Sequence, residues 1–240
     1  MPNWVYNGLT IEGSPESVDK LVSQLNQPFT VMHETWDIST NSFIKKNTLY
    51  SNPVFAFWNI VKPTDMDAYY GPSPKVDLNK PIRFDSNHWY DWNVRNWGTK
   101  WDVAISVTES HPETYMEGPI NNGDNKVVYY NFNTAWSYPE PAIKNLSLQF
   151  SDLLFTLGYE EETGWGGEAE FLRGEIISHN QYDYKCKDCE YATSDALEFC
   201  EDCSDYPCPQ CGWASAVDEC PVHSVEYDQK QTQLQEANNV

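Results

Sequence analysis

The sequence predicts an α+β sandwich followed by a small metal-binding module. Over residues 1–180, strand-like and helix-like patterns follow the order strand, helix, long insert, strand, strand, helix, strand. This is the order of a split βαβ sandwich, in which helices cover one face of an antiparallel sheet. All seven cysteines lie in residues 183–226, in pairs with metal-ligand spacing, which indicates a separate module. Residues 227–240 are expected to form a polar, disordered tail.

The first strand and the first helix have strong local signals. Apolar and polar side chains tend to alternate over residues 4–12, and many of them are β-branched or aromatic, which favours a strand. Ser14 followed by Pro15 is typical of a helix start, with an N-cap and a proline at the first helical position. Apolar residues continue at helical spacing to Leu25, so we expect the helix to end near Pro28.

Residues 29–100 are expected to form the long insert. The apolar run over residues 54–61 fits a strand or a short helix, and the Pro- and Gly-rich residues 65–81 are typical of a loop. Residues 88–101 carry four tryptophans. This density indicates an aromatic cluster, with a helical turn through Trp89.

The remaining elements complete the sandwich. Further strands are expected over residues 103–107, 127–133, 159–162 and 168–177. Residues 121–124, Asn-Asn-Gly-Asp, form a turn signal, and a helix is expected from Pro139 to Phe155 with Gly158 as its stop. The predicted topology is ferredoxin-like. The term describes topology only, because residues 1–180 contain no cysteine that could hold an iron–sulfur cluster.

The chain is strongly acidic, with 36 acidic and 15 basic side chains and a formal net charge of −21. The net charge is −11 over residues 1–182 and −10 over residues 183–240, so it is denser in the C-terminal part. Such a field repels nucleic acid and anionic membranes and attracts basic protein surfaces. Solubility alone explains the charge equally well.

The sequence predicts a cytosolic protein. No apolar stretch reaches about 18 residues, so we expect no membrane span. The N-terminal residues lack the basic start and apolar run of a secretory signal. Cysteines with metal-type spacing also fit a reducing compartment.

The C-terminal module carries the strongest chemical signal in the chain. Four ligand pairs with C-x-x-C or C-x-x-H spacing suffice for two zinc ions per chain, and four protein ligands per ion leave no position for a substrate. The expected ligands are Cys186, Cys189, Cys200, Cys203, Cys208, Cys211, Cys220 and His223. Sequential ligation would give the first four to one ion and the last four to the other, and an interleaved cross-brace is the alternative. Disulfides would leave one of the seven cysteines unpaired.

Several short motifs resemble those of the YubB ferredoxin-like domain family. They are residues 1–4 (Met-Pro-Asn-Trp), 96–102 (Asn-Trp-Gly-Thr-Lys-Trp-Asp), 134–139 (Thr-Ala-Trp-Ser-Tyr-Pro) and 159–161 (Tyr-Glu-Glu). The similarity covers roughly residues 1–180. It implies the sandwich fold and an origin on a phage or conjugative plasmid, and it implies no reaction. The long insert and the acidic metal module depart from the commonest pattern of the family.

Two groups of residues are candidates for interaction. In the first, Trp97 and Trp101 flank Gly98, which permits unusual backbone angles, and Lys100 is placed for a cation–π contact. A rigid corner leading into the next strand is the simpler explanation of this group. The second group lies in the metal module and comprises Trp213, Glu198, Glu201, Asp202 and Asp205.

These observations lead to three functional hypotheses. The first is a phage-encoded acidic protein of the host cytoplasm that binds a host or phage protein with a basic surface, or a nucleoprotein complex, with mimicry of nucleic acid as one means. The second is a virion or assembly component. The third is an enzyme of unknown chemistry that uses the Trp-rich insert and Glu168 with Glu170, which share one face of a strand. A solvated sheet face explains that pair more simply, and the acidic residues disfavour direct binding of nucleic acid.

Overall fold

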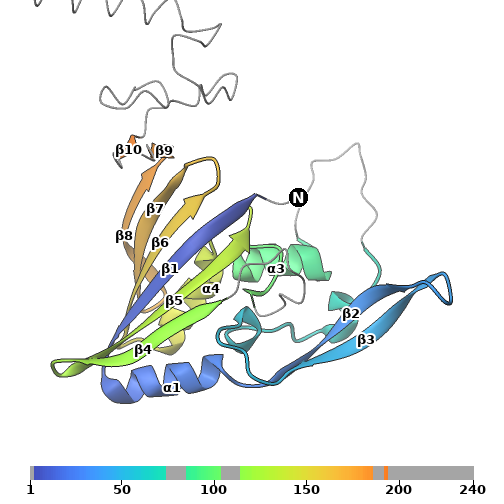
Figure 1. Ribbon diagram of the computed structural model, residues 1–240, viewed down its shortest axis with the longest axis horizontal. Coiled ribbons are helices and arrows are strands. Elements are labelled where there is room, and N and C mark those ends of the chain that lie inside the picture. Colours follow the sequence, from blue (N-terminus) through green and yellow to red (C-terminus); the bar gives the residue numbers. More distant parts are fainter. Residues whose placement is uncertain (1–2, 74–84, 104–113, 186–191, 194–240) are drawn as a thin grey trace, which may run out of the picture. The chain divides into compact units, whose positions relative to one another are not determined.

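The structure is a computed structural model of the 240-residue chain. It describes residues 3–73, 85–103, 114–185 and 192–193 (Figure 1). The chain divides into two compact units, which are residues 1–162 with 167–180, and residues 163–166 with 181–240. In the second unit, strand β9 (Tyr184–Lys185) pairs antiparallel with β10 (Ala192–Thr193).

The first unit is built on a six-stranded sheet with the order β4-β5-β1-β6-β7-β8. The strands are β1 (Trp4–Gly13), β4 (Tyr115–Asn122), β5 (Asn125–Ala135), β6 (Leu154–Glu161), β7 (Gly166–Leu172) and β8 (Glu175–Tyr182). Strand β1 runs antiparallel to β5 and β6, and β5 runs antiparallel to β4. The α+β class with an antiparallel sheet is therefore confirmed.

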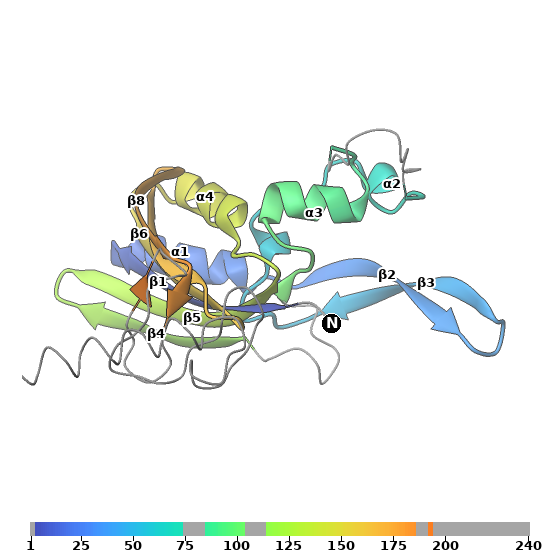
Figure 2. The same ribbon diagram turned by 90° about the horizontal axis from the view of Figure 1, so that it is seen from above.

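Helices cover one face of this sheet. Helix α1 (Pro15–Leu25) and helix α4 (Glu140–Gln149) lie on the same side of the strands (Figure 2). Alternation along the strands turns one set of side chains toward the helices, and these residues are fully buried. The core includes Val5, Leu9 and Ile11 of β1, Tyr130 and Phe132 of β5, Phe155 and Leu157 of β6, Ala169 and Phe171 of β7, and Leu21, Ile143 and Leu146 of the helices. None of the described helices is long and apolar enough to cross a membrane.

The insert contains more regular structure than its sequence indicates. It holds a hairpin of β2 (Phe29–Asp37) and β3 (Ser42–Tyr50), a 3₁₀ helix η1 (Phe57–Asn59), and the helices α2 (Met66–Tyr69) and α3 (Trp89–Trp97). The hairpin was not among the expected elements. Helix α3 confirms the helical turn expected through Trp89, and the apolar run over residues 54–61 contains η1. Residues 65–81, expected to form a loop, contain the short helix α2.

The predicted first strand, first helix and β4–β5 turn are confirmed. Strand β1 covers the expected residues, and Ser14 caps α1 as predicted, because its hydroxyl oxygen accepts a hydrogen bond from the Ser17 backbone nitrogen at 3.3 Å. The turn expected over residues 121–124 joins β4 to β5, with Gly123 at a φ of 61°. Of the strand expected over residues 103–107, all but Val103 lies outside the described residues.

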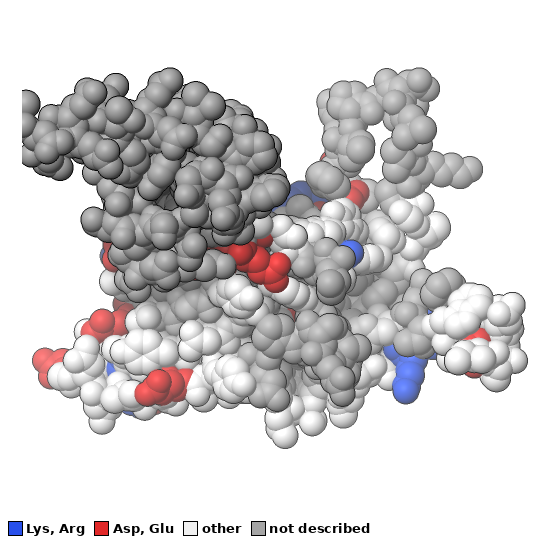
Figure 3. All heavy atoms as spheres, turned by 45° about the horizontal axis from the view of Figure 1, so that its top comes forward, with Lys and Arg blue, Asp and Glu red and all other residues white. Residues whose placement is uncertain are grey.

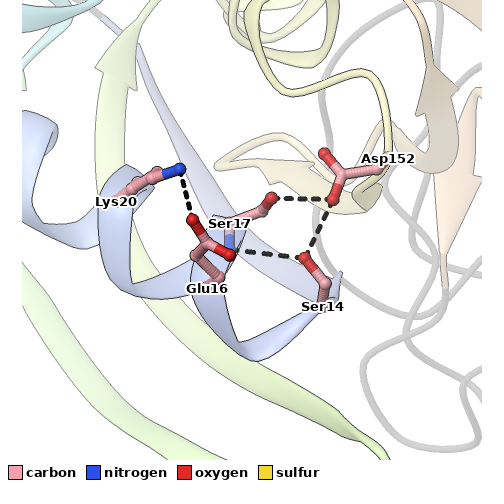
Figure 4. Close-up of polar contacts among 5 residues, drawn as sticks. All are labelled: Ser14, Glu16, Ser17, Lys20 and Asp152. Carbon is pink, nitrogen blue, oxygen red and sulfur yellow. Dashed lines mark hydrogen bonds and ion pairs between the residues drawn. The ribbon is translucent and has the colours of Figure 1, made fainter.

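Asp152 connects the start of α1 to the turn before β6 (Figure 4). Its carboxylate accepts hydrogen bonds from the hydroxyls of Ser17 at 2.7 Å and Ser14 at 2.9 Å. The bond from Ser17 is the main reason why the pKa of Asp152 lies below its usual value. One turn further along, Lys20 pairs with Glu16 at 2.7 Å.

The prediction of a helix from Pro139 to Phe155 was confirmed as far as Gln149 and was wrong beyond it. Helix α4 ends at Gln149, and Leu154–Glu161 forms strand β6. Burial alternates along β6, so Phe155 and its alternate neighbours pack against the helices. Gly158 therefore lies inside a strand and stops no helix.

The prediction of one strand over residues 168–177 was also wrong. The chain turns at Arg173 and Gly174, with φ angles of 56° and 82°, and forms two strands, β7 and β8. Two successive left-handed residues are the geometry of a tight hairpin turn. This dipeptide was an overlooked turn signal.

Candidate functional site

Segments that are far apart in the sequence meet beside the start of β1. The backbone nitrogen of Trp136 donates a hydrogen bond to the carbonyl oxygen of Asn3 at 2.9 Å. The rings of Trp4 and Trp101 lie 6.3 Å apart. The motifs at residues 1–4, 96–102 and 134–139 thus contribute to one place, which we call the aromatic corner. Its members are Trp4, Tyr90, Lys100, Trp101 and Trp136.

Gly98 and Thr99 hold the backbone of the aromatic corner. Gly98 ends α3 in the left-handed conformation, with a φ of 82°, and a Cβ atom there would lie 2.6 Å from Cδ of Pro141. The Thr99 hydroxyl both donates to the carbonyl oxygen and accepts from the nitrogen of Ala135, at 3.0 Å each. Ser137 adds a hydrogen bond from its hydroxyl to the Gly98 carbonyl oxygen. These bonds join the loop after α3 to the end of β5.

Lys100 places its ammonium group among three aromatic rings. The Nζ atom lies 4.4 Å from the ring centroid of Trp101, 4.8 Å from that of Trp136 and 6.0 Å from that of Tyr90. The cation–π contact expected for Lys100 is therefore present. Within the described part of the chain, no carboxylate forms an ion pair with Lys100, so the rings are its principal partners. Each such contact contributes about 0.5–1 kcal/mol at a solvent-exposed site.

Trp97 has a different position from its neighbours. Only 1% of its surface is exposed, and its indole nitrogen donates to the Val61 carbonyl oxygen at 2.9 Å. Its ring packs against Phe57, Trp58 and Trp92. Trp97 therefore supports the corner from inside, behind the surface that Lys100 and Trp101 form.

Sequence reasoning missed three members of this site, of which Trp4 stands in the recognised 1–4 motif. Trp136 is 45% exposed and has a φ of 71°, a conformation that is rare for a bulky residue. Tyr90 is half-buried and lies edge-on to Trp136, with 6.4 Å between the ring centroids. Trp136 stands in the recognised 134–139 motif, which was the one available signal, whereas nothing local singles out Tyr90.

A second polar cluster adjoins the corner at Tyr138. The ring of Tyr138 stacks on Tyr159, with centroids 4.0 Å apart, and the Tyr159 hydroxyl lies 2.7 Å from Nε2 of His179. The Tyr138 hydroxyl donates to Glu140 at 2.8 Å. Burial alone would raise the pKa of Glu140, but hydrogen bonds from Lys144 and Tyr138 outweigh it and lower this pKa. Burial raises the pKa of both tyrosines, so both hydroxyls stay protonated at neutral pH, and their stacked rings connect the sheet to the start of α4.

The structure places Glu168 and Glu170 on the face of the sheet that points away from helices α1 and α4. They alternate along β7 with the buried Ala169 and Phe171, so their side chains point away from the helices. A shallow, open hollow of about 700 Å³ lies elsewhere, along α1. Its lining residues are Glu16, Asp19, Lys20, Ser23, Gln24, Gln27 and Asn59. The two glutamates therefore do not line this hollow.

The proposed zinc ligands all lie outside the described residues, and the ligation scheme stays a prediction. The same holds for the interaction candidates Trp213, Glu198, Glu201, Asp202 and Asp205. Among the residues that the structure describes, no group of three or more His, Cys, Asp or Glu side chains could hold a metal ion.

Comparison with known proteins supports a ferredoxin-like domain. Residues 117–201 match the model of a family described as "Ferredoxin-like domain in Api92-like protein". This range takes in β5, α4, β6, β7 and β8. The class of protein defined here is thus an α+β protein with a ferredoxin-like domain.

At the level of particular proteins, the chain is similar to protein api92 from Yersinia pseudotuberculosis, known from a crystal structure. The sequence identity is 10%, the TM-score is 0.41, and the match covers 78% of this chain and 100% of that chain. No curated protein matches the chain.

Proposed function

We propose that this chain is a phage-encoded binding protein of the host cytoplasm that recognises a basic surface on a partner protein. The observation that carries the proposal is the net charge of −21, which is spread over both parts of the chain. A field of this sign and size attracts cationic surfaces and accelerates their association. The phage origin rests on the motif resemblance to the YubB ferredoxin-like domain family.

The described residues support this proposal through the placement of their basic groups. Lys20, Lys126 and Lys144 each form an ion pair with a nearby acid, at 2.6–2.8 Å. Lys100 is held among aromatic rings. Three of the described lysines are thus paired with acids, and red Asp and Glu atoms are more widespread than blue Lys and Arg atoms on the described surface in Figure 3.

In the proposal, zinc gives the C-terminal segment its folded shape. Residues 183–240 carry 13 acidic and 3 basic side chains. Zinc does not cancel this excess, because four thiolates around a divalent ion leave about −2, and three thiolates with a neutral histidine leave about −1. The folded module would present Glu198, Glu201, Asp202 and Asp205 beside Trp213 as an acidic contact surface.

The partner would be a protein whose basic surface normally contacts nucleic acid. An acidic protein surface competes for such a site by reproducing the charge of the phosphate backbone. Direct binding of nucleic acid by this chain would place like charges together, so it is not part of the proposal.

A pull-down from host lysate with the tagged full-length chain tests the proposal. One variant, which we call the tail variant, neutralises four acids of the metal module rather than of residues 227–240, and it combines E198Q, E201Q, D202N and D205N. A matched control variant removes the same charge from exposed acids of the first unit and combines D67N, D124N, E162Q and E175Q.

We expect a partner that is captured at low salt, released at high salt, lost with the tail variant and retained with the control variant. Capture that resists salt and survives in the tail variant would contradict the proposal. Equal loss with both variants would also count against it, because it would indicate unspecific attraction to total charge.

A further inference from the structure

The face of the six-stranded sheet that points away from α1 and α4 is an ordered grid of side chains. On β1, Gly8 lies opposite Asn131 of β5 and opposite Gly158 of β6. Thr10 lies opposite Tyr129 in the same way. We call this surface the tyrosine face. Its members are Tyr6, Gly8 and Thr10 of β1, Tyr129 and Asn131 of β5, Gly158 of β6, and Tyr115 and Glu117 of β4.

The tyrosine face displays large aromatic side chains. Tyr6 is 51% exposed, Tyr115 is 60% exposed and Tyr129 is 38% exposed. No described helix packs on this side of the sheet, as Figure 2 shows. Tyrosine is enriched at protein interfaces because its ring is apolar and its hydroxyl can form a hydrogen bond. Three of them on adjacent strands form a surface suited to stacking.

Two glycines leave bare backbone in the middle of the tyrosine face. Gly8 and Gly158 are direct cross-strand partners in β1 and β6. Neither has a positive φ, and an added Cβ atom would make only ordinary contacts, 3.6 Å from Oδ1 of Asn131 and 3.9 Å from the Gly8 carbonyl oxygen, respectively. The fold therefore does not require glycine at either position. Glycine also weakens a strand, so its presence here calls for another explanation. Glycine inside a strand often marks a site where another chain or a ligand approaches closely.

Charge selects the kind of molecule that fits this surface. Alternation and register place five carboxylates on the same face of the sheet, and they belong to Glu12, Glu117, Glu160, Glu168 and Glu170. At the open-face positions of the described β1, β5, β6 and β7, no lysine or arginine occurs. The face therefore repels phosphate and attracts cations.

Aromatic rings beside carboxylates favour arginine over lysine. A guanidinium group stacks flat on an aromatic ring and pairs with a carboxylate through two hydrogen bonds. An ammonium group is a compact, strongly hydrated point charge that gains less from a flat ring. Tyr129 lies opposite Glu117 across the strands, so a ring and a carboxylate are already paired.

We propose that the tyrosine face binds an arginine-rich extended segment of the partner protein. Its backbone would pass over Gly8 and Gly158, and its guanidinium groups would stack on Tyr6 and Tyr129 with Glu117 as a charge partner. This inference rests on the proposed function, because it assumes a basic partner. It adds the contact surface in the first unit and the side-chain class that is recognised.

Fluorescence anisotropy with labelled peptides tests the inference on the full-length chain. The probes are an oligoarginine peptide and an oligolysine peptide of equal length. The main variant combines Y6A and Y129A, and its matched control combines Y6F and Y129F, which keep both rings. A third variant, G8T, adds a strand-favouring side chain to the bare backbone and is expected to fold at least as stably as the parent.

We expect oligoarginine to bind several-fold more tightly than oligolysine. The Y6A/Y129A variant should weaken oligoarginine binding by about fivefold or more, and the Y6F/Y129F variant should not. G8T should reduce binding although its unfolding midpoint is maintained. The tail variant should keep the preference for arginine.

Equal affinity for the two peptides, or full binding by both Y6A/Y129A and G8T, would overturn the inference. If oligoarginine binding is instead lost only in the tail variant, the tyrosine face is excluded while the proposed function stands. If a partner is captured from lysate through the tyrosine face and the tail variant captures it equally well, the tyrosine face is supported and the metal module is excluded as the contact surface.

Discussion

The buried carboxylate of Asp102 provides a sharp test of how the insert is attached to the sandwich. Asp102 is 3% exposed, and its two oxygens accept hydrogen bonds from the backbone nitrogens of Phe57 and Trp58, at 2.8 Å each. These nitrogens begin η1, and the preceding residue, Ala56, has no side chain that could cap them. Replacing Asp102 by alanine removes both acceptors at once.

The expected cost follows from these two bonds. A hydrogen bond to a charged group contributes about 1.5–3 kcal/mol, and a buried donor without a partner loses the solvation it had in the unfolded chain. Loss of the buried charge itself offsets part of this cost. We therefore expect D102A to lower the free energy of unfolding by about 3–5 kcal/mol. D102N should cost about 2–3 kcal/mol, because its amide offers one acceptor and places a donor against the other N–H group.

Urea unfolding of the full-length variants, followed by tryptophan fluorescence, measures these differences. D124N in the β4–β5 turn is the matched control, since Asp124 is exposed and its substitution should change stability by less than about 0.5 kcal/mol. A D102A protein whose unfolding free energy lies within about 1 kcal/mol of the parent would refute the reasoning. Indistinguishable unfolding curves for D102A and D124N would refute it as well.

Three further predictions follow from other parts of the chain. G98A should destabilise the protein by about 2 kcal/mol or more, because Gly98 has a φ of 82° and lies against Pro141; a thermal melt checks this, and an unchanged midpoint would contradict it. Burial lowers the pKa of His33 below its usual 6.5, so the folded state disfavours the protonated ring and stability should fall as pH drops below 6.5 through the folded pKa. H33Q should remove this part of the acid sensitivity. If the stability of H33Q and of the parent protein depends on pH in the same way, His33 is not a source of the acid sensitivity. Metal analysis should find two zinc ions per chain, with C208S losing one of them; a chain without zinc, or with its cysteines joined as disulfides, would eliminate the metal module.

Part of the candidate site could be predicted from sequence alone. The 96–102 motif led to Lys100 and Trp101, and Lys100 does lie over the Trp101 ring. The same motif also suggested Trp97, which the structure buries, because composition does not tell which of two tryptophans faces the core. Trp136 could not be assigned to the site from sequence, because it belongs there through contacts with residues more than thirty positions away in the chain, such as Lys100.

Local sequence determined the elements whose signals lie within a few residues of each other. Ser14 and Pro15 specify the start of α1 through capping and a restricted φ, and Asn-Gly at residues 122–123 specifies the turn between β4 and β5. Metal-ligand spacing likewise depends only on near neighbours. Such signals need no knowledge of the rest of the fold.

Tertiary structure decided which of two acceptable local states was used. Residues 154–157 are apolar enough to extend helix α4, but pairing with β1 buries Phe155 and Leu157 and satisfies the backbone of a strand. The tyrosine face likewise exists only because register brings β1, β4 and β5 together. The free energy of long-range burial and strand pairing exceeds the small local preferences, so it selects among them.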